Sequence, residues 1–291
     1  MVASEPVSVW DVGAELGEGP VWVERDRALW FTDIKRQQIH RFDPESGGRR
    51  SWDAPEQVGF VLPAASGGFV AGLMSGLHRF NEVSGDFERI AEVDSHLPEN
   101  RLNDGVVDPA GRIWFGTMHN GERDTSGSFY RFENGQVIHT GLTNICITNG
   151  PALSPEGRIL YFIDTLARTI DACDVADDGS LGPARPFVRI APEDGNPDGP
   201  TIDSEGCVWV GMYNGWQALR YSPAGELVDR VRFPVGNITK LAFGGPDLKT
   251  VFATTARQLL KPEELERQPQ AGNLFSFRVD VPGIPGSLVA I

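Results

Sequence analysis

The chain has 291 residues, of which 40% are hydrophobic, and it carries a formal net charge of −14 with no basic tail or block of Lys and Arg. This charge argues against DNA, RNA or an anionic membrane surface as a partner, and no apolar run approaches the roughly 18 residues that a membrane-spanning helix needs. The 34 Gly and 21 Pro residues favour a protein of strands and turns over a helical one.

The first ten residues, MVASEPVSVW, lack the basic segment and the long apolar segment of a secretory signal. The three cysteines, Cys146, Cys173 and Cys207, are odd in number and match no CxxC metal motif. Together these features predict a cytoplasmic protein whose thiols are buried or inert.

Six similar units follow one another along the chain, and each contains a strand headed by an aromatic residue. The heads are Trp30, Phe69, Trp114, Tyr161, Trp209 and Phe252. The units occupy residues 28–47, 68–85, 112–135, 159–179, 207–225 and 250–277. Turn phrases precede four of the heads, namely DPAG (108–111), SPEG (154–157), DSEG (203–206) and GPD (245–247). Pro presets φ and Gly supplies positive φ in such turns.

Short strands that recur with a period of about 40–50 residues are typical of a β-propeller. The sequence therefore predicts an all-β, six-bladed β-propeller with four antiparallel strands in each blade, formed as a single domain by residues 1–291. The best helical segment is short and covers residues 261–267, with Pro262 at its start. We expect residues 7–12 and 287–291 to share one blade and close the ring, because an open ring would leave sheet edges unpaired.

Side chains at one register of the six units are expected to meet at the axis of the propeller. The strand before each aromatic head is the innermost strand of its blade and runs along the central channel. The positions 11 or 12 residues before the heads are Glu18, Gln57 or Val58, Asn103, Asn149, Asp198, and Lys240 or Leu241. Four units thus place a carboxylate or a carboxamide at one height, although Asn or Asp before Gly is also an ordinary turn former.

These four side chains, Glu18, Asn103, Asn149 and Asp198, offer only oxygen atoms as ligands. Oxygen ligands suit Ca²⁺, Mg²⁺ and Mn²⁺, and less decisively Fe²⁺ and Zn²⁺. Two converging carboxylates repel each other and are costly to bury without a cation. The pattern therefore predicts one divalent metal ion at the axis, with coordination positions left for water and substrate, and leaves the identity of the metal open.

Arg101 lies two residues before Asn103, so on an extended strand both side chains share a face. We expect Arg101 to orient a polar substrate or to stabilise an oxyanion, with a surface salt bridge as the alternative. Asp104 is expected to pair with Arg101 or to hold a loop. His119 follows the head strand of the third unit and is a candidate substrate contact near the channel mouth. The chain contains no GxSxG, HExxH, P-loop or GxGxxG motif.

Several phrases spread over nearly the whole chain form a specific joint pattern. They are LGEGPVW (16–22), RLNDG (101–105), DPAGR (108–112), GTM (116–118), ITNGP (147–151), SPEG (154–157), PDG (197–199), DSEG (203–206), FGGPDL (243–248), TTA (254–256) and RQPQAG (267–272). The pattern resembles the senescence marker protein/gluconolactonase/luciferin-regenerating enzyme family, which includes regucalcin and bacterial sugar lactonases. The phrases MHNGE (118–122) and ICITNGP (145–151) look closest to bacterial pentonolactonases of the xylonolactonase and arabinonolactonase kind.

The resemblance implies a six-bladed propeller with one divalent metal ion at its axis. It implies that Glu18, Asn149 and Asp198 are the metal ligands and that Arg101 and Asn103 bind the substrate.

Some relatives carry a glutamate three residues after the GTM phrase. Gly121 stands at that position in this chain, which predicts that the substrate contact made by the glutamate is absent here.

The residues and the resemblance together predict a metal-dependent hydrolase that opens a sugar lactone, a xylono-, arabinono- or gluconolactone, to the aldonic acid. The metal would polarise the lactone carbonyl, and Asp198 is the candidate general base. Two alternatives stay open, a metal-dependent phosphotriesterase or other esterase and a Ca²⁺-binding or interaction propeller without catalysis. A closed ring has no forced interface, so a monomer is expected.

Overall fold

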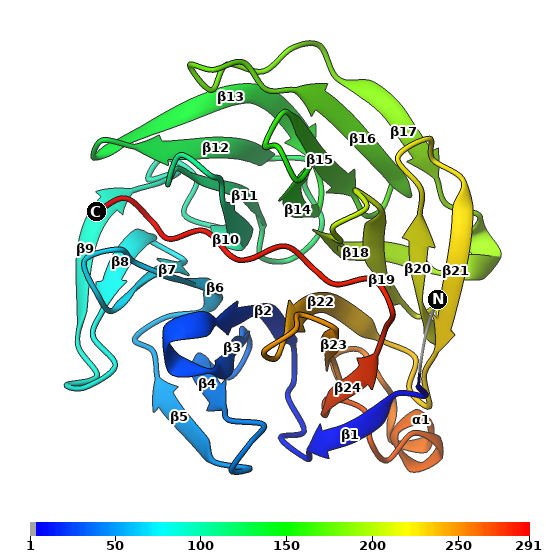
Figure 1. Cartoon of the computed structure of the whole chain (residues 1–291). Helices are drawn as coiled ribbons and strands as arrows, with labels where there is room; N and C mark the ends of the chain where they lie inside the picture. Colours follow the sequence, from blue (N-terminus) through cyan, green and yellow to red (C-terminus); the bar gives the residue numbers. More distant parts are fainter. Residues whose placement is uncertain (1–3) are drawn as a thin grey trace.

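Six four-stranded antiparallel sheets are arranged in a ring (Figure 1). The structure is a computed structural model that describes residues 4–291; the first three residues of the segment compared above with a secretory signal lie outside it. The prediction of a six-bladed β-propeller is therefore confirmed. No helix in residues 4–291 has both the length and the apolar character needed to cross a membrane.

The strands of the blades follow in chain order. Blade one is β2 (Gly17–Val23), β3 (Ala28–Asp33), β4 (Gln38–Phe42) and β5 (Arg49–Asp53). Blade two is β6 (Val58–Pro63), β7 (Phe69–Leu73), β8 (Gly76–Phe80) and β9 (Phe87–Glu92). Blade three is β10 (Asn100–Val107), β11 (Ile113–His119), β12 (Gly127–Glu133) and β13 (Gln136–Ile145). Blade four is β14 (Thr148–Leu153), β15 (Ile159–Asp164), β16 (Thr169–Asp174) and β17 (Arg185–Arg189). Blade five is β18 (Asn196–Ile202), β19 (Val208–Tyr213), β20 (Gln217–Tyr221) and β21 (Leu227–Arg232). Blade six is β22 (Ile238–Gly244), β23 (Thr250–Thr255), β24 (Leu274–Arg278) and β1 (Val7–Trp10).

The predicted helix is present as α1 (Pro262–Arg267), an insertion between β23 and β24. Short 3-10 turns occupy Glu24–Asp26 and Pro192–Asp194. All three cysteines are free and buried.

The aromatic heads lie in the second strand of each blade and are tied to the turns that precede them. In blade three the Asp108 carboxylate accepts hydrogen bonds from the backbone N–H of Arg112 (3.0 Å) and from the indole N–H of Trp114 (2.8 Å). In blade five Asp203 does the same for Cys207 (3.0 Å) and Trp209 (2.9 Å). The turn aspartate thus satisfies the one polar atom of a buried tryptophan, which fixes the hairpin against the core.

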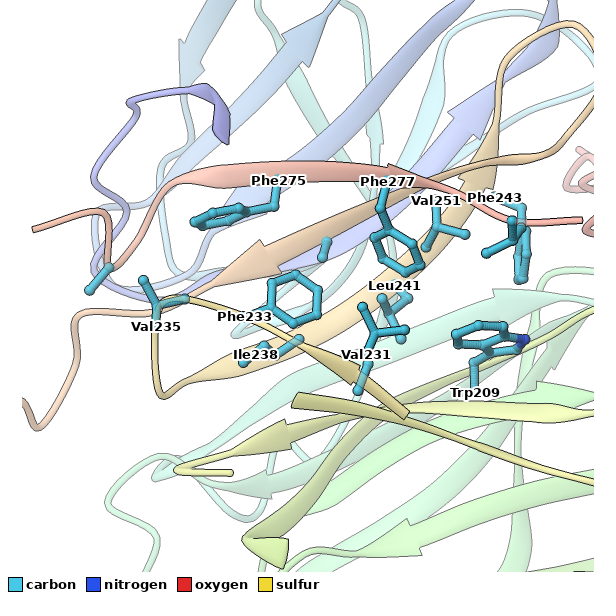
Figure 2. Packing of buried hydrophobic residues seen from close by; sticks show 14 residues of the cluster. Trp209, Val231, Phe233, Val235, Ile238, Leu241, Phe243, Val251, Phe275 and Phe277 are labelled. Atoms are coloured by element: carbon cyan, nitrogen blue, oxygen red, sulfur yellow. The ribbon is translucent and has the colours of Figure 1, made fainter. Parts of the chain in front are cut away.

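The hydrophobic core sits between neighbouring blades. Figure 2 shows one such cluster, in which Trp209 and Val231 of blade five meet Leu241, Phe243 and Phe277 of blade six. Phe243 lies edge-on to Trp209 with ring centroids 6.1 Å apart. Because each sheet buries both faces against its neighbours, the ring holds together by side-chain packing of this kind.

The expected closure of the ring is right for the N-terminal segment and wrong for the C-terminal one. Strand β1 completes blade six by pairing with β24, with Val7 opposite Ser276. Residues 283–291, which we call the C-terminal strap, instead cross one end of the ring (Figure 1). There Val289 bridges Ala64 of blade two, and Ala290 donates its N–H to Gly111 of blade three (2.9 Å). Strand β1 already pairs with the outer edge of β24, so the C-terminal strap has no free edge there to join. The strap instead covers the apolar end of the channel.

Candidate functional site

Four inner strands bring the predicted axial residues to one cavity of about 150 Å³. Glu18 of β2, Asn103 of β10, Asn149 of β14 and Asp198 of β18 all line it, and each is at most 6% exposed. Arg101 lines the same cavity. The remaining lining residues are Leu16, Glu122, Ile147, Thr165, Leu166, Asn196, Tyr213, Gln258 and Leu259.

A break in strand pairing recurs beside each of these residues. The register between the first and second strands shifts immediately after Glu18 in blade one and after Asn149 in blade four. The inner strands of the other four blades shift at the corresponding positions. Such bulges bend a strand and redirect its side chains. The Gly that follows Glu18 or Asn149 has a positive φ of 52° or 82°, so the turn-forming phrases serve here to bend the inner strands.

A chain of hydrogen bonds fixes the two carboxamides. Arg101 Nη1 donates to Asn103 Oδ1 (2.5 Å), and Asn103 Nδ2 donates to Asn149 Oδ1 (3.0 Å) and to the carbonyl of Thr148 (2.6 Å). Asn149 Nδ2 in turn donates to Thr165 Oγ1 (2.9 Å). Each amide therefore keeps one orientation, which a preorganised binding site requires.

The carboxyl groups of Glu18 and Asp198 both have a raised pKa, which favours their protonated, uncharged state. Burial and the charge of Asp104 raise the pKa of Glu18 to about 7. Burial and the neighbouring Glu18 hold the pKa of Asp198 well above its usual range. Two like charges in one buried cavity repel each other, so each carboxyl favours the protonated state of the pair.

The guanidinium of Arg101 is buried, which lowers its pKa to about 10, while Glu122, Glu18 and Asp198 oppose this shift. Even at this value the group stays protonated at neutral pH. It therefore offers several N–H donors inside the cavity.

An ion pair separates this cavity from a second one in the channel. Asp104 pairs with Lys240 of blade six rather than with Arg101, and its carboxylate also accepts the backbone N–H groups of Gly105 (2.8 Å) and Gly150 (3.0 Å). Beyond this pair the channel opens into a second, apolar cavity of about 180 Å³ that the C-terminal strap covers. Glu18 lines the first cavity and Gly19 the second, so the wall changes character within one residue.

The rim of the site contains residues that sequence reasoning missed. Glu122 lines the cavity, although the sequence did not single it out. It follows Gly121 by one residue and has a φ of 55°, which turns its side chain back toward the channel. Gln258 of blade six faces it, with Nε2 3.3 Å from Glu122 Oε1, and the hydroxyl of Tyr213 holds the Gln258 carbonyl (2.7 Å). The sequence signal that could have indicated Glu122 is its place directly after Gly121, the position at which some relatives carry a glutamate.

His119 is not among the residues that line the cavity. Its ring accepts the N–H of Gly121 through Nδ1 (3.0 Å), and its Nε2 lies 3.5 Å from Asp124. The side chain therefore stabilises the turn after β11.

The donor set fits a divalent cation. In residues 4–291 no group of three His, Cys, Asp or Glu side chains is arranged to hold a metal ion. Glu18 and Asp198 are two carboxyls only, and Asn149 adds an amide oxygen to the same cavity. Two buried carboxyls that repel each other are the pair that a divalent cation would satisfy.

Comparisons with known proteins agree with this geometry. A model described as the SMP-30/Gluconolactonase/LRE-like region matches residues 16–257. The chain is 34% identical to a 6-deoxy-6-sulfogluconolactonase of Pseudomonas putida over 94% of this chain and 95% of that protein. It is also 34% identical to an L-arabinolactonase of Azospirillum brasilense over 94% and 91% of the two chains. The crystal structure of a calcium-binding protein, regucalcin, from Agrobacterium tumefaciens superposes with a TM-score of 0.95 at 27% identity and covers 99% of this chain and 98% of that one. The chain belongs to the SMP-30/gluconolactonase/LRE-like family.

Proposed function

We propose that the protein is a metal-dependent sugar lactonase, a carboxylic ester hydrolase that opens an aldonolactone to the aldonic acid. The observation that carries this proposal is the meeting of the buried carboxyls of Glu18 and Asp198, two fixed carboxamides and a buried arginine in one cavity. The names of the two bacterial relatives, both lactonases, support the same reaction class.

Glu18, Asn149 and Asp198 would hold the divalent cation, whether Ca²⁺, Zn²⁺, Mn²⁺, Mg²⁺ or Fe²⁺. When bound, such an ion supplies a Lewis acid for the lactone carbonyl and for the attacking water.

The side chains of this chain supply the remaining steps. Asp198 accepts the proton of the attacking water through the carboxyl oxygen that is not used as a ligand. Arg101 donates N–H bonds to the oxyanion or to a ring hydroxyl, and Asn103 positions Arg101 through their 2.5 Å hydrogen bond.

The size of the cavity limits the substrate. A cavity of about 150 Å³ accommodates a single six-membered ring such as benzene, and the site cavity has this volume. A lone five- or six-membered lactone ring therefore fits, as in xylono-, arabinono- or gluconolactone. The carboxyls of Glu18, Asp198 and Glu122 favour a neutral ring over an anionic one.

Calcium binding without catalysis is the second candidate function. The description of the Agrobacterium regucalcin as a calcium-binding protein favours it. The arginine and the two amides beside the carboxyls favour the enzyme, because Ca²⁺ binding alone needs no buried guanidinium.

A panel of lactones tests the proposal. The enzyme is treated with chelator, each divalent metal is added back, and hydrolysis of five- and six-membered sugar lactones is followed by acid release. We expect no activity after chelation, recovery with at least one metal, and loss of that activity by at least about 10³-fold in Asp198→Ala.

Full activity in a folded Asp198→Ala protein of verified metal content would contradict the role of Asp198. Metal binding without hydrolysis of any lactone would favour the calcium-binding alternative.

A further inference from the structure

Lys240 occupies the axial position of blade six, whereas four other blades contribute the oxygen-bearing side chains Glu18, Asn103, Asn149 and Asp198. Its side chain is 8% exposed. The stem lies flat on Gly199 of blade five, because a Cβ at Gly199 would come within 2.6 Å of Lys240 Cγ. The ammonium group reaches across the channel to Asp104 Oδ1.

Asp104 is a further carboxylate close to the site. It follows Asn103, which lines the cavity, and its Oδ2 accepts the N–H of Gly150, the residue after Asn149. Its Oδ1 accepts the N–H of Gly105 and the ammonium group of Lys240. Without the ammonium group, Asp104 would add an unpaired negative charge beside the cavity that contains Glu18 and Asp198.

We propose that Lys240 is the residue that sets the cation affinity and charge preference of the site, by neutralising Asp104 and leaving Glu18 and Asp198 as the anionic pair. This inference rests on the metal site of the proposed function. Cation sites in proteins tune affinity by the number of charges around the ion. A neutralised Asp104 matches the site to a divalent ion and works against a trivalent one.

Two single substitutions distinguish this electrostatic role from a purely structural one, in which the ion pair only fills the channel. Lys240→Met removes the positive charge and leaves Asp104 anionic, so cation binding should tighten. Asp104→Asn removes the negative charge and leaves the ammonium group, so cation binding should weaken. If the pair only filled the channel, both substitutions would loosen the site and both would weaken binding.

The experiment measures binding and not activity. Chelator-treated full-length protein is titrated with Ca²⁺ and with Tb³⁺ by calorimetry at fixed ionic strength. We expect Lys240→Met to bind Ca²⁺ at least about tenfold more tightly, with a larger gain for Tb³⁺, and Asp104→Asn to bind both at least about tenfold more weakly.

The double variant Lys240→Met/Asp104→Asn is the matched control, because it removes the buried pair without leaving a charge unpaired. It should return within about threefold of the wild-type affinities and should fold even if Lys240→Met is unstable without metal. In that event the contrast between weakened binding in Asp104→Asn and near-wild-type binding in the double variant carries the test.

Weaker binding in both single variants, or a double variant that binds as weakly as Asp104→Asn, would overturn the role of Lys240 and leave the proposed function intact. A wild-type protein that binds neither ion would overturn the metal site itself, and this inference with it.

Discussion

At the scale of single residues, two aspartates on the inner strands of blades three and five have opposite surroundings. Asp104 is satisfied by an ammonium group and two backbone N–H groups, whereas Asp198 meets the carboxyl of Glu18. The first is paired with a cation, whereas burial and Glu18 raise the pKa of the second well above its usual range. Position in the strand is similar, so the partners decide the chemistry of each group.

The raised pKa of Glu18 predicts how stability depends on pH. Its pKa is about 7 in the folded protein and about 4.5 when unfolded, so the folded state holds the extra proton between these values. The free energy of unfolding of the chelated protein should therefore fall as the pH rises from about 4.5 to about 7, by up to about 3 kcal/mol from this group. Denaturant unfolding at several pH values measures it.

Glu18→Gln is the control for this prediction. His40, whose buried ring has a pKa lowered to about 4, gives a slope of the opposite sign below about pH 6.5, and the variant keeps that slope. The difference between wild type and variant reports the coupled pair of Glu18 and Asp198, because Glu18 also raises the pKa of Asp198, and saturating divalent cation should abolish it. A difference that does not change with pH would contradict the prediction.

At the scale of elements, the inner strands approach each other so closely that side chains are excluded. A Cβ on Gly59 of β6 would lie 2.4 Å from the carbonyl oxygen of Asn103 in β10. The glycine sets the distance between blades two and three beside two residues of the site. Backbone contact of this kind cannot be relieved by a rotamer change.

Gly59→Ala should therefore move β10 and disturb Arg101 and Asn103. We expect a loss of about 1–3 kcal/mol of stability together with a fall in kcat/KM on the preferred lactone. Gly182→Ala is the control, because the nearest atom to its Cβ would be 3.6 Å away. A Gly59→Ala protein with unchanged unfolding midpoint and kinetics would show that the blades can separate without cost.

The sequence could predict the elements because they repeat. One register, counted back from Trp30, Trp114 or Trp209, leads to inner-strand positions that the structure brings to one cavity. Glu122 and Gln258 escaped because they lie in connections, where the path of the backbone follows tertiary contacts and no periodic pattern marks it. The partner of Asp104 escaped for another reason: Lys240 lies at the axial register of β22, but its pairing across the channel is a tertiary contact that no repeat marks. The metal and substrate roles of these residues stay predictions.

At the scale of the whole molecule, the C-terminal strap braces the ring. Its Gly283 bridges Asp203 of blade five and donates its N–H to Leu248 of blade six, and Val289 and Ala290 contact blades two and three. These contacts pair positions that are far apart in sequence, so the repeat gave no indication of them. The site cavity lies on the other side of the Asp104–Lys240 pair.

Val289→Asp should destabilise the ring without changing the site. Val289 is 1% exposed, and its burial contributes about 1.5–3 kcal/mol. We expect a melting temperature lower by several degrees and little change in kcat. Leu288→Asp is the control, because Leu288 is 45% exposed.

Thermal unfolding and lactone kinetics measure both effects, and equal melting temperatures for the two variants would refute the bracing role. A single unfolding transition in the wild type would also support the expectation of one domain.

The pairing of β1 with β24 has a consequence for folding during synthesis on the ribosome. The hydrogen bond between Asn273 and Ser8 joins residues 265 positions apart. At ribosomal rates of about 5–20 residues per second, the first strand waits roughly 15–50 seconds for its partner to be synthesised. During that interval its edge is open to any strand that reaches it, including the β1 segment of another nascent chain. Crowded polysomes should therefore be the place where this protein is most at risk of aggregation.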